Sequence, residues 1–299
     1  MNAKVSAIYL VVVLIWSTTP LGIVWSSESV HPTMAVLLRM AIAAALGLII
    51  IMVKRIPLPT HKTAFKLYSF SAIGIFGGMS LAYMAARYLP SGTMSLIFGL
   101  SPIISALLAR RLLGEPRFNL LRKISLAVSL IGLAIVCSDN LTIEQDSWLG
   151  IVFLLLAVFF FSLSGVLVKG IKITINPLST TVGALLLTLP CFTLLWVLMD
   201  GSLPITQWSS RSIYSILYLG VFGSLIGFVA YYYILQKLEA STVALVTLMT
   251  PVIALAIGAV FNQEAITTKL IIGAILVMVG LALFLYGDRI NRHIARLRL

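Results

Sequence analysis

One charged side chain, Arg39, stands well inside a long apolar segment, and it offers the clearest chemistry in this sequence. It follows Pro32 by seven residues in the stretch "HPTMAVLLR". A charge within an apolar segment is costly to bury, so such a residue is a functional candidate by default. Two interpretations of Arg39 stay open. Either it binds the carboxylate of a small molecule or contacts an outer gate, or it makes a structural ion pair or hydrogen bond and reaches toward lipid headgroups.

Hydroxyl and aromatic side chains gather next to prolines or a glycine in several apolar segments. A proline within a helix leaves the carbonyl four residues earlier without its usual N–H partner, and in a membrane that carbonyl needs another partner. Here Pro102 and Pro251 would free the carbonyls of Phe98 and Thr247. The candidate substrate-binding residues are Trp16, Ser17, Thr18, Arg39, Tyr83, Phe98, Ser101, Phe161, Ser162, Tyr232, Thr247 and Thr250, and the candidate helix-opening residues are Pro20, Pro102 and Pro251. For each hydroxyl, ordinary helix packing with a bond back to its own helix is the alternative.

Acidic and histidine side chains are missing from the interiors of the apolar segments. All nine Asp and Glu residues and the three His residues fall in loops or at segment ends. Proton-driven pumps commonly place such groups within the membrane, so we expect facilitated diffusion or exchange rather than carboxylate-based proton coupling. An intramembrane enzyme would need a nucleophile with a base, a carboxylate pair or metal ligands. The sequence offers neither HExxH nor GxSxG, and we expect no enzyme, no metal and no cofactor.

Composition indicates an integral membrane protein. Of the 299 residues, 60% are hydrophobic and 10% are charged, against about 25% charged residues in soluble proteins. The formal charge of +12 lies in short clusters between apolar runs, which is typical of cytoplasmic loops and not of a nucleic-acid surface. Cys137 and Cys191 suggest neither a disulfide framework nor a metal site. The N-terminal run resembles a signal peptide without a clear cleavage site, so we expect a retained first span.

Ten segments are long and apolar enough to span a bilayer as helices, which takes about 20 residues. They are 5–25, 33–53, 66–88, 91–113, 119–137, 148–169, 177–199, 211–236, 240–262 and 267–287. Seventeen of the 21 Lys and Arg residues fall in one set of alternate loops and three in the other. Because cytoplasmic loops carry the excess of positive charge, both termini are predicted to be cytoplasmic.

The second half of the chain repeats the first. "GLSPIISALLARRLLGE" (99–115) matches "LMTPVIALAIGAVFNQE" (248–264) at an offset of 149 residues, and "LYSFSAIGIFGG" (67–78) matches "IYSILYLGVFGS" (213–224) at 146. Five helices in each copy place the second copy upside down in the membrane, as in many secondary transporters. The predicted fold class is all-α integral membrane: ten transmembrane helices as two inverted five-helix repeats, residues 1–140 and 145–290. The small-xxx-small spacing in both matched glycine stretches predicts close helix packing.

These motifs resemble those of a known family. "HPTMAVLLR", and the helices that carry a proline and end in "LGE" or "QE", resemble the EamA-type branch of the drug/metabolite transporter superfamily. The resemblance covers nearly the whole chain and implies export of small metabolites through a cavity between the halves. The second copy departs from this pattern at two positions. Ala184 stands where Arg39 would recur, and Gln263 replaces the glycine of "LGE".

The expected function is a secondary transporter, an exporter, of small neutral or zwitterionic metabolites such as amino acids, working by alternating access. An exporter or exchanger of drug-like or cationic compounds, or of methylated cofactors such as S-adenosylmethionine, is the alternative. A non-transport membrane protein or an enzyme is more remote. A phosphorylated substrate would need several internal cations, and only Arg39 and Lys169 qualify. The expected partners are a small-molecule substrate and the lipid bilayer of a bacterial inner membrane, without nucleic acid, for a monomer or a homodimer.

Overall fold

The computed structural model describes residues 3–114, 118–143, 146–171, 173, 175–237 and 240–297, and within these ranges it contains helices and no strand. The elements follow in order: α1 (Ala3–Ser26), α2 (Pro32–Val53), α3 (Lys62–Ala72), the π-helix η1 (Ile73–Gly78), α4 (Met79–Ala85), α5 (Ser91–Phe98), α6 (Ser101–Leu112), α7 (Leu120–Ile143), α8 (Ser147–Lys169), α9 (Pro177–Met199), the 3-10 helix η2 (Ile205–Gln207), α10 (Ser210–Tyr218), the π-helix η3 (Leu219–Ile226), α11 (Gly227–Lys237), α12 (Ala240–Asn262) and α13 (Thr268–Leu297). The prediction of an all-helical membrane protein is confirmed.

Eight helical stretches in the described part of the chain are long and apolar enough to cross a membrane. They are Val5–Ser26, Pro32–Val53, Lys62–Ala85, Ser91–Leu112, Leu120–Ser138, Ser147–Lys169, Pro177–Met199 and Ser210–Lys237, and shorter apolar helices cover Met249–Asn262 and Thr268–Phe284. These stretches overlap the ten segments expected from the sequence. Ten crossings, and their direction, remain predictions.

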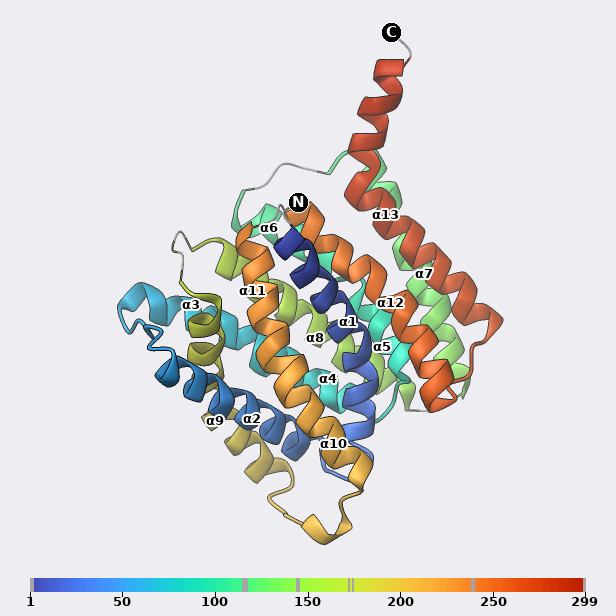
Figure 1. Cartoon of the computed structure of the whole chain (residues 1–299). Coiled ribbons are helices and arrows are strands. Elements are labelled where there is room, and N and C mark those ends of the chain that lie inside the picture. The colour runs from blue at the N-terminus through green and yellow to red at the C-terminus, as the bar shows by residue number, and fades with distance from the viewer. Residues whose placement is uncertain are drawn as a thin grey trace.

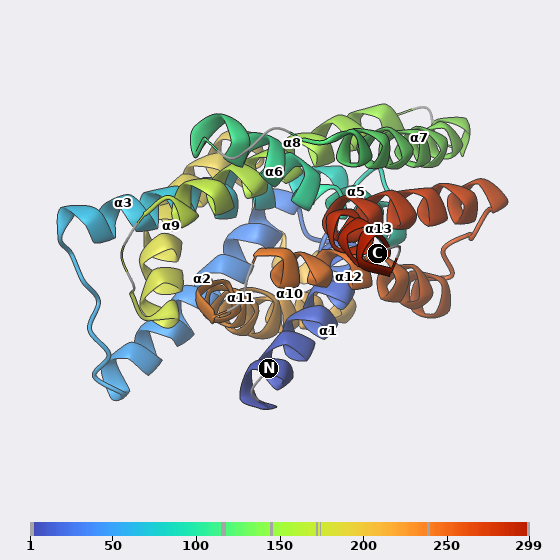
Figure 2. The same ribbon diagram turned by 90° about the horizontal axis from the view of Figure 1, so that it is seen from above.

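The helices form one bundle with two distinct edges. α7 and α13 lie side by side along one edge, while α2, α3 and α9 pack together at the opposite edge (Figure 1, Figure 2). α1 passes between these edges and contacts α5, α10, α11 and α12. Side chains of α1 therefore reach the middle of the bundle, where helices from both halves of the chain meet.

Both π-helices fall on the matched glycine stretches. η1 carries "IGIFGG" and η3 carries "LGVFGS". A Cβ atom at Gly74 would lie 2.7 Å from Ser164 Cβ, and one at Gly220 would lie 2.8 Å from Ile42 Cγ2. Glycine is required at both places because a neighbouring helix approaches too closely for a side chain. The neighbours differ, since η1 packs chiefly against α8 and η3 chiefly against α2.

Left-handed residues follow four helices at matched places. In the described chain they are Arg55 (φ 50°) after α2, Gly201 (φ 64°) after α9, Gly114 (φ 71°) after α6 and Gln263 (φ 52°) after α12. A residue in this conformation commonly ends a helix, and glycine adopts it most easily. Each half of the chain has one glycine and one residue with a side chain in this role.

The helices with matched prolines differ in continuity. α5 and α6 are separated by a turn at Gly99 and Leu100, where the Leu100 N–H donates to Ile97 O at 3.1 Å. α1 and α12 continue as helices through Pro20 and Pro251, so a visible break accompanies only Pro102. The physical difference is the residue three positions before the proline, which is Gly99 in the first copy and Leu248 in the second. Glycine weakens a helix by about 1 kcal/mol relative to alanine.

Candidate functional site

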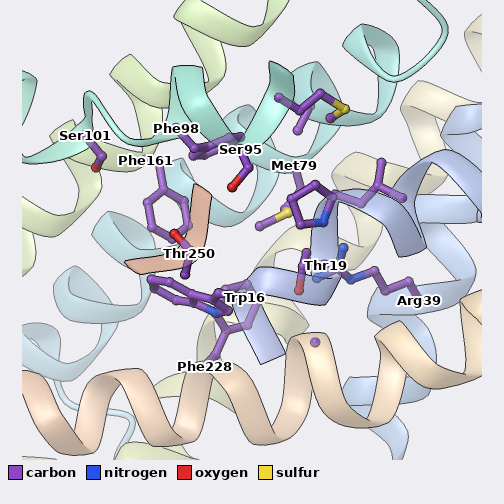
Figure 3. A pocket seen from close by; sticks show the side chains of 15 residues that line it. Trp16, Thr19, Arg39, Met79, Ser95, Phe98, Ser101, Phe161, Phe228 and Thr250 are labelled. Atoms are coloured by element: carbon purple, nitrogen blue, oxygen red, sulfur yellow. The ribbon is translucent and has the colours of Figure 1, made fainter. Parts of the chain in front are cut away.

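A cavity of about 90 Å³ lies in the middle of the bundle. Its volume is several times the roughly 10–15 Å³ that holds one water molecule. The lining residues come from both halves of the chain: Trp16, Thr19, Pro20, Ile23, Arg39, Met79, Ala82, Met94, Ser95, Phe98, Ser101, Phe161, Gly223, Phe228 and Thr250 (Figure 3). Most of this wall is apolar, and a few hydroxyls and one guanidinium supply the polar atoms, as in sites for small molecules.

Three pairs of lining residues occupy equivalent places in the two copies. With the offsets of the sequence repeat, these pairs are Trp16 with Phe161, Ala82 with Phe228, and Ser101 with Thr250. In each pair, equivalent helices of the two halves each contribute one side chain to the cavity wall. Arg39 breaks the pattern, because its counterpart Ala184 is fully buried in α9 and is not part of the described lining.

An aromatic cluster forms one side of the cavity. The Trp16 and Phe161 ring centroids lie 6.0 Å apart with an interplanar angle of 78°, and those of Phe98 and Phe161 lie 6.3 Å apart. Tyr231 extends the cluster behind the wall, with its ring 5.0 Å from that of Trp16. Such edge-to-face contacts stabilise the ring positions beyond simple burial. The rings thus form a firm apolar surface for a ligand.

Arg39 forms another part of the wall, and its side chain is fully buried. Its Nε donates to Ser224 Oγ at 2.7 Å, and Ser224 Oγ donates in turn to Met40 Sδ at 3.7 Å. The guanidinium carbon lies 5.9 Å from the centroid of the Tyr83 ring. Neither terminal nitrogen, Nη1 or Nη2, has a hydrogen-bond partner among the described residues. Gly223 makes room for the group, because a Cβ there would lie 3.1 Å from Nη2.

Seven of the fifteen residues proposed from the sequence line this cavity. They are Trp16, Pro20, Arg39, Phe98, Ser101, Phe161 and Thr250. On α1 the lining residues are spaced as one helix face, because Trp16 is followed by Thr19, Pro20 and Ile23. The helical periodicity of this segment would therefore have distinguished the residues that line the cavity from the residues between them.

Two hydroxyls next to Trp16 turn away from the cavity. Ser17 Oγ donates to Val13 O at 2.7 Å, which is the ordinary back-bond within a helix. The Thr18 hydroxyl lies 2.6 Å from the Tyr218 hydroxyl, outside the described lining. Neighbouring residues point in different directions around a helix, since each advances by about 100°. Ser17 and Thr18 therefore lie beside the cavity rather than in its described lining, and their contact with a substrate stays a prediction.

The other proposed residues stand behind or beside the wall. Tyr83 is fully buried behind Arg39 and accepts a weak hydrogen bond from Ser26 Oγ at 3.5 Å. The Ser162 hydroxyl oxygen lies 3.1 Å from that of Ser101, so it supports a lining residue. Tyr232 lines a separate cavity of about 10 Å³. Pro102 and Pro251 are not among the lining residues, and the Thr247 side chain lies outside the described part of the structure.

Several lining residues were not proposed from the sequence. They are Ile23, Met79, Ala82, Met94, Ser95, Gly223 and Phe228, and Thr19 follows from the helix face of Trp16. Ser95 lies one turn before Phe98, so the same periodicity would have found it. Phe228 corresponds to Ala82 in the repeat, but neither was proposed, so the repeat alone did not identify this pair. Met79 and Met94 gave no sequence signal apart from their apolar character.

Helix ends meet in a hydrogen-bond network beyond the cavity. The Glu264 carboxylate accepts from the Ser91 N–H at 2.9 Å and the Gly92 N–H at 3.0 Å, at the start of α5. Asn262 Nδ2 donates to Glu264 Oε1 at 3.1 Å, and Trp25 Nε1 donates to Asn262 Oδ1 at 2.8 Å. A carboxylate is favoured here because a helix N-terminus exposes N–H groups and partial positive charge. The network ties α1, α5 and α12 together at one end.

Comparison with known proteins agrees with this architecture. The model of the EamA-like transporter family matches the chain twice, over residues 4–138 and 148–286. The chain is 25% identical to "Uncharacterized transporter YoaV" of Bacillus subtilis, covering 90% of this chain and 92% of the relative. It is 24% identical to a "Probable amino-acid metabolite efflux pump" of Salmonella typhimurium, covering 98% of each. A solved crystal structure shares the fold with a TM-score of 0.65 at 17% identity, covering 95% of this chain and 98% of that one. Since the family model covers most of the chain, the protein belongs to the EamA-like transporter family and is a multi-pass membrane transporter.

Proposed function

We propose that the protein is a secondary transporter that exports small neutral or zwitterionic metabolites, amino acids foremost, through the central cavity by alternating access. The observation that carries this proposal is the composition of the wall. Its matched pairs come from equivalent places in the two copies, including Trp16 with Phe161 and Ser101 with Thr250. A site between two inverted copies is the arrangement in which rocking one copy against the other changes the side from which a ligand enters.

Three observations support two inverted copies, residues 1–140 and 145–290. The family model matches twice, the π-helices η1 and η3 fall on the same motif, and the left-handed residues after helices occur in matched positions. The excess of Lys and Arg in alternate loops supports cytoplasmic termini in a bacterial inner membrane. In that orientation, the network around Glu264 lies on the outer side of the membrane.

Amino acids are favoured as substrates by the mixed chemistry of the wall. Trp16, Phe98 and Phe161 suit an apolar side chain, while Arg39 and the hydroxyls suit the polar end. The names of the Salmonella typhimurium and Escherichia coli relatives as amino-acid metabolite efflux pumps support the same class. The described lining contains no Asp, Glu or His, which supports facilitated diffusion or exchange.

A second candidate is export or exchange of drug-like or cationic compounds or methylated cofactors. The observation in its favour is the cluster of Trp16, Phe98 and Phe161, because aromatic faces bind quaternary and sulfonium cations. The guanidinium of Arg39 opposes it, since like charges in one small apolar cavity repel each other. The described lining also lacks a nucleophile with a base, so catalysis is not proposed.

Flux through purified protein in liposomes tests the proposal. Liposomes loaded with radiolabelled phenylalanine, leucine or S-adenosylmethionine are expected to release an amino acid faster than protein-free liposomes, with little dependence on an imposed proton gradient. Trp16→Ala is expected to lower this flux at least about tenfold, because it removes a central part of the wall. Trp148→Ala is the matched control, since Trp148 is largely exposed at the start of α8. Equal release with and without folded protein, for every compound, would overturn the proposal.

A further inference from the structure

We infer that Arg39 binds the carboxylate of the transported molecule while the aromatic cluster of Trp16, Phe98 and Phe161 holds its side chain. The substrate class is then small monocarboxylates with an apolar or aromatic side chain, with or without an α-amino group. This inference rests on the proposed function and specifies how the same cavity selects its ligand.

Within the described structure, Arg39 uses only one of its nitrogen atoms in a hydrogen bond. A guanidinium has five N–H donors in a planar fork. The Nε–H is used by Ser224, and the four N–H groups on Nη1 and Nη2 have no partner among the described residues. One N–H from each of these nitrogens forms a pair that matches the two oxygens of a carboxylate. In Figure 3 the guanidinium lies beside Thr19, at the wall of the cavity.

The protein holds this fork in place. Ser224 Oγ accepts from Nε, and Ser224 donates to Met40 Sδ, so the serine hydroxyl is oriented by both contacts. The Tyr83 ring lies behind the guanidinium at 5.9 Å. Gly223 leaves the space that Nη2 occupies. A ligand therefore meets a donor pair whose position is already fixed, and less entropy is lost on binding.

Arg39 has no opposite charge among its described neighbours. Its described neighbours Thr19, Tyr83, Gly223, Ser224 and Met40 are all without a formal negative charge. A fully buried cation without an anion is unfavourable in an apolar medium. A carboxylate placed on the fork both neutralises the charge and accepts the free N–H groups. A neutral amide accepts with one oxygen and brings no charge.

The aromatic cluster holds the end of the ligand that lies away from the carboxylate. The Trp16, Phe98 and Phe161 rings suit a flat or branched apolar group. No acidic residue is part of the described lining, so an α-ammonium finds no opposite charge there and meets hydroxyls such as those of Ser95 and Thr250. Recognition of the carboxylate is therefore strong and recognition of the amino group is weak.

A panel of four related compounds tests this selectivity by direct binding to the purified, folded protein. The compounds are phenylalanine, 3-phenylpropionate, phenylalaninamide and phenethylamine, which share the ring and differ in the carboxylate and the amine. The two carboxylates are expected to bind within a few-fold of each other, and the amide and the amine at least about tenfold more weakly. Equal binding of phenylalanine and its amide would overturn the inference.

Variants of Arg39 separate ligand recognition from a structural role. In Arg39→Gln the preference for 3-phenylpropionate over phenylalaninamide is expected to disappear, and Arg39→Lys is expected to restore only part of it, because lysine lacks the planar fork. Ser224→Ala keeps the guanidinium but removes its anchor, and it remains informative if Arg39→Gln does not fold. It is expected to reduce the preference several-fold. If both variants keep the full preference for carboxylates, Arg39 is structural and the inference is wrong.

Flux measurements keep the two proposals distinguishable. If liposomes transport phenylalanine and phenylalaninamide equally well, the carboxylate inference fails while the transporter proposal stands. If the carboxylates bind selectively through Arg39 but no compound crosses the membrane, the transporter proposal fails and the binding site stands.

Discussion

The segments η1 and η3 carry the same motif in the two copies, yet they face different partners. Beside η3, the α2 helix places Arg39 against Ser224 and Gly223. Beside η1, the main partner is α8, where Ser164 Oγ donates to Phe70 O at 2.7 Å. Close helix packing is thus shared by both copies, but the charge is present in only one. In the proposed repeat, a single residue therefore places a charge at one end of the cavity.

This comparison also explains why Ala184 is small. Ala184 corresponds to Arg39 but is fully buried in α9, among apolar residues of the main core. The described lining does not include it, so a charge there would have no cavity to face. The asymmetry then reflects packing as well as ligand chemistry.

The largest effect is expected when a charge is placed in the second copy. Ala184→Arg is expected to lower the free energy of unfolding by about 3 kcal/mol or more, because it buries an unpaired cation within a membrane helix. Thermal unfolding and the monodisperse fraction of purified protein measure the effect. Ala184→Ser is the neutral control and is expected to remain close to the native protein. If Ala184→Arg folds with unchanged stability, the second copy also has room for a charge and the proposed reason for the asymmetry is wrong.

The two motifs are next compared by adding one methyl group to each. In Gly223→Ala the new Cβ would lie 3.1 Å from Arg39 Nη2, so the fork shifts and the preference for carboxylates is expected to fall about tenfold. In Gly77→Ala the new Cβ would lie 2.9 Å from Phe160 Cγ, which is expected to cost about 1–3 kcal/mol of stability and leave the preference unchanged.

Binding competition and thermal unfolding of both glycine variants provide the test. The comparison predicts opposite outcomes, with selectivity lost in Gly223→Ala and stability lost in Gly77→Ala. Equal losses of selectivity in the two variants would mean that the motifs act through general packing rather than through the position of Arg39.

Sequence reasoning predicted the helices well because their signal is local. Apolar runs of about 20 residues define a span, and Pro32 and Pro177 mark the first turns of α2 and α9. It did not predict η1 and η3 as π-helices, because their wider hydrogen-bond pattern depends on the helix packed against them. It also did not foresee that α5 and α6 are separate while α12 is continuous.

Part of the cavity lining was predicted, for a similar reason. Trp16, Phe161 and Arg39 stand out by residue type, and they do line the cavity. Ser17 and Thr18 were proposed because their hydroxyls precede Pro20 in an apolar segment, but neighbouring side chains of a helix point in different directions. Which faces of α5 and α11 line the cavity depends on contacts between the two halves, and the sequence of one segment does not specify those contacts.

The smallest expected effect concerns the left-handed residues that follow α6 and α12. Gly114 (φ 71°) and Gln263 (φ 52°) occupy the same place in the two copies, and a Cβ at Gly114 would meet no atom of the described residues within 4 Å. An exchange at these positions therefore tests the backbone conformation with little change in packing. Gly114→Gln is expected to lower the free energy of unfolding by about 1 kcal/mol, because a residue with a side chain is strained in this conformation. Gln263→Gly is expected to raise it by slightly less, because glycine also gains entropy in the unfolded chain.

Thermal unfolding of the two single variants and the double exchange measures both terms. Opposite signs with near-cancellation in the double variant follow from equivalent helix ends, whereas a loss in both single variants would show that Gln263 has side-chain contacts that outweigh its strain.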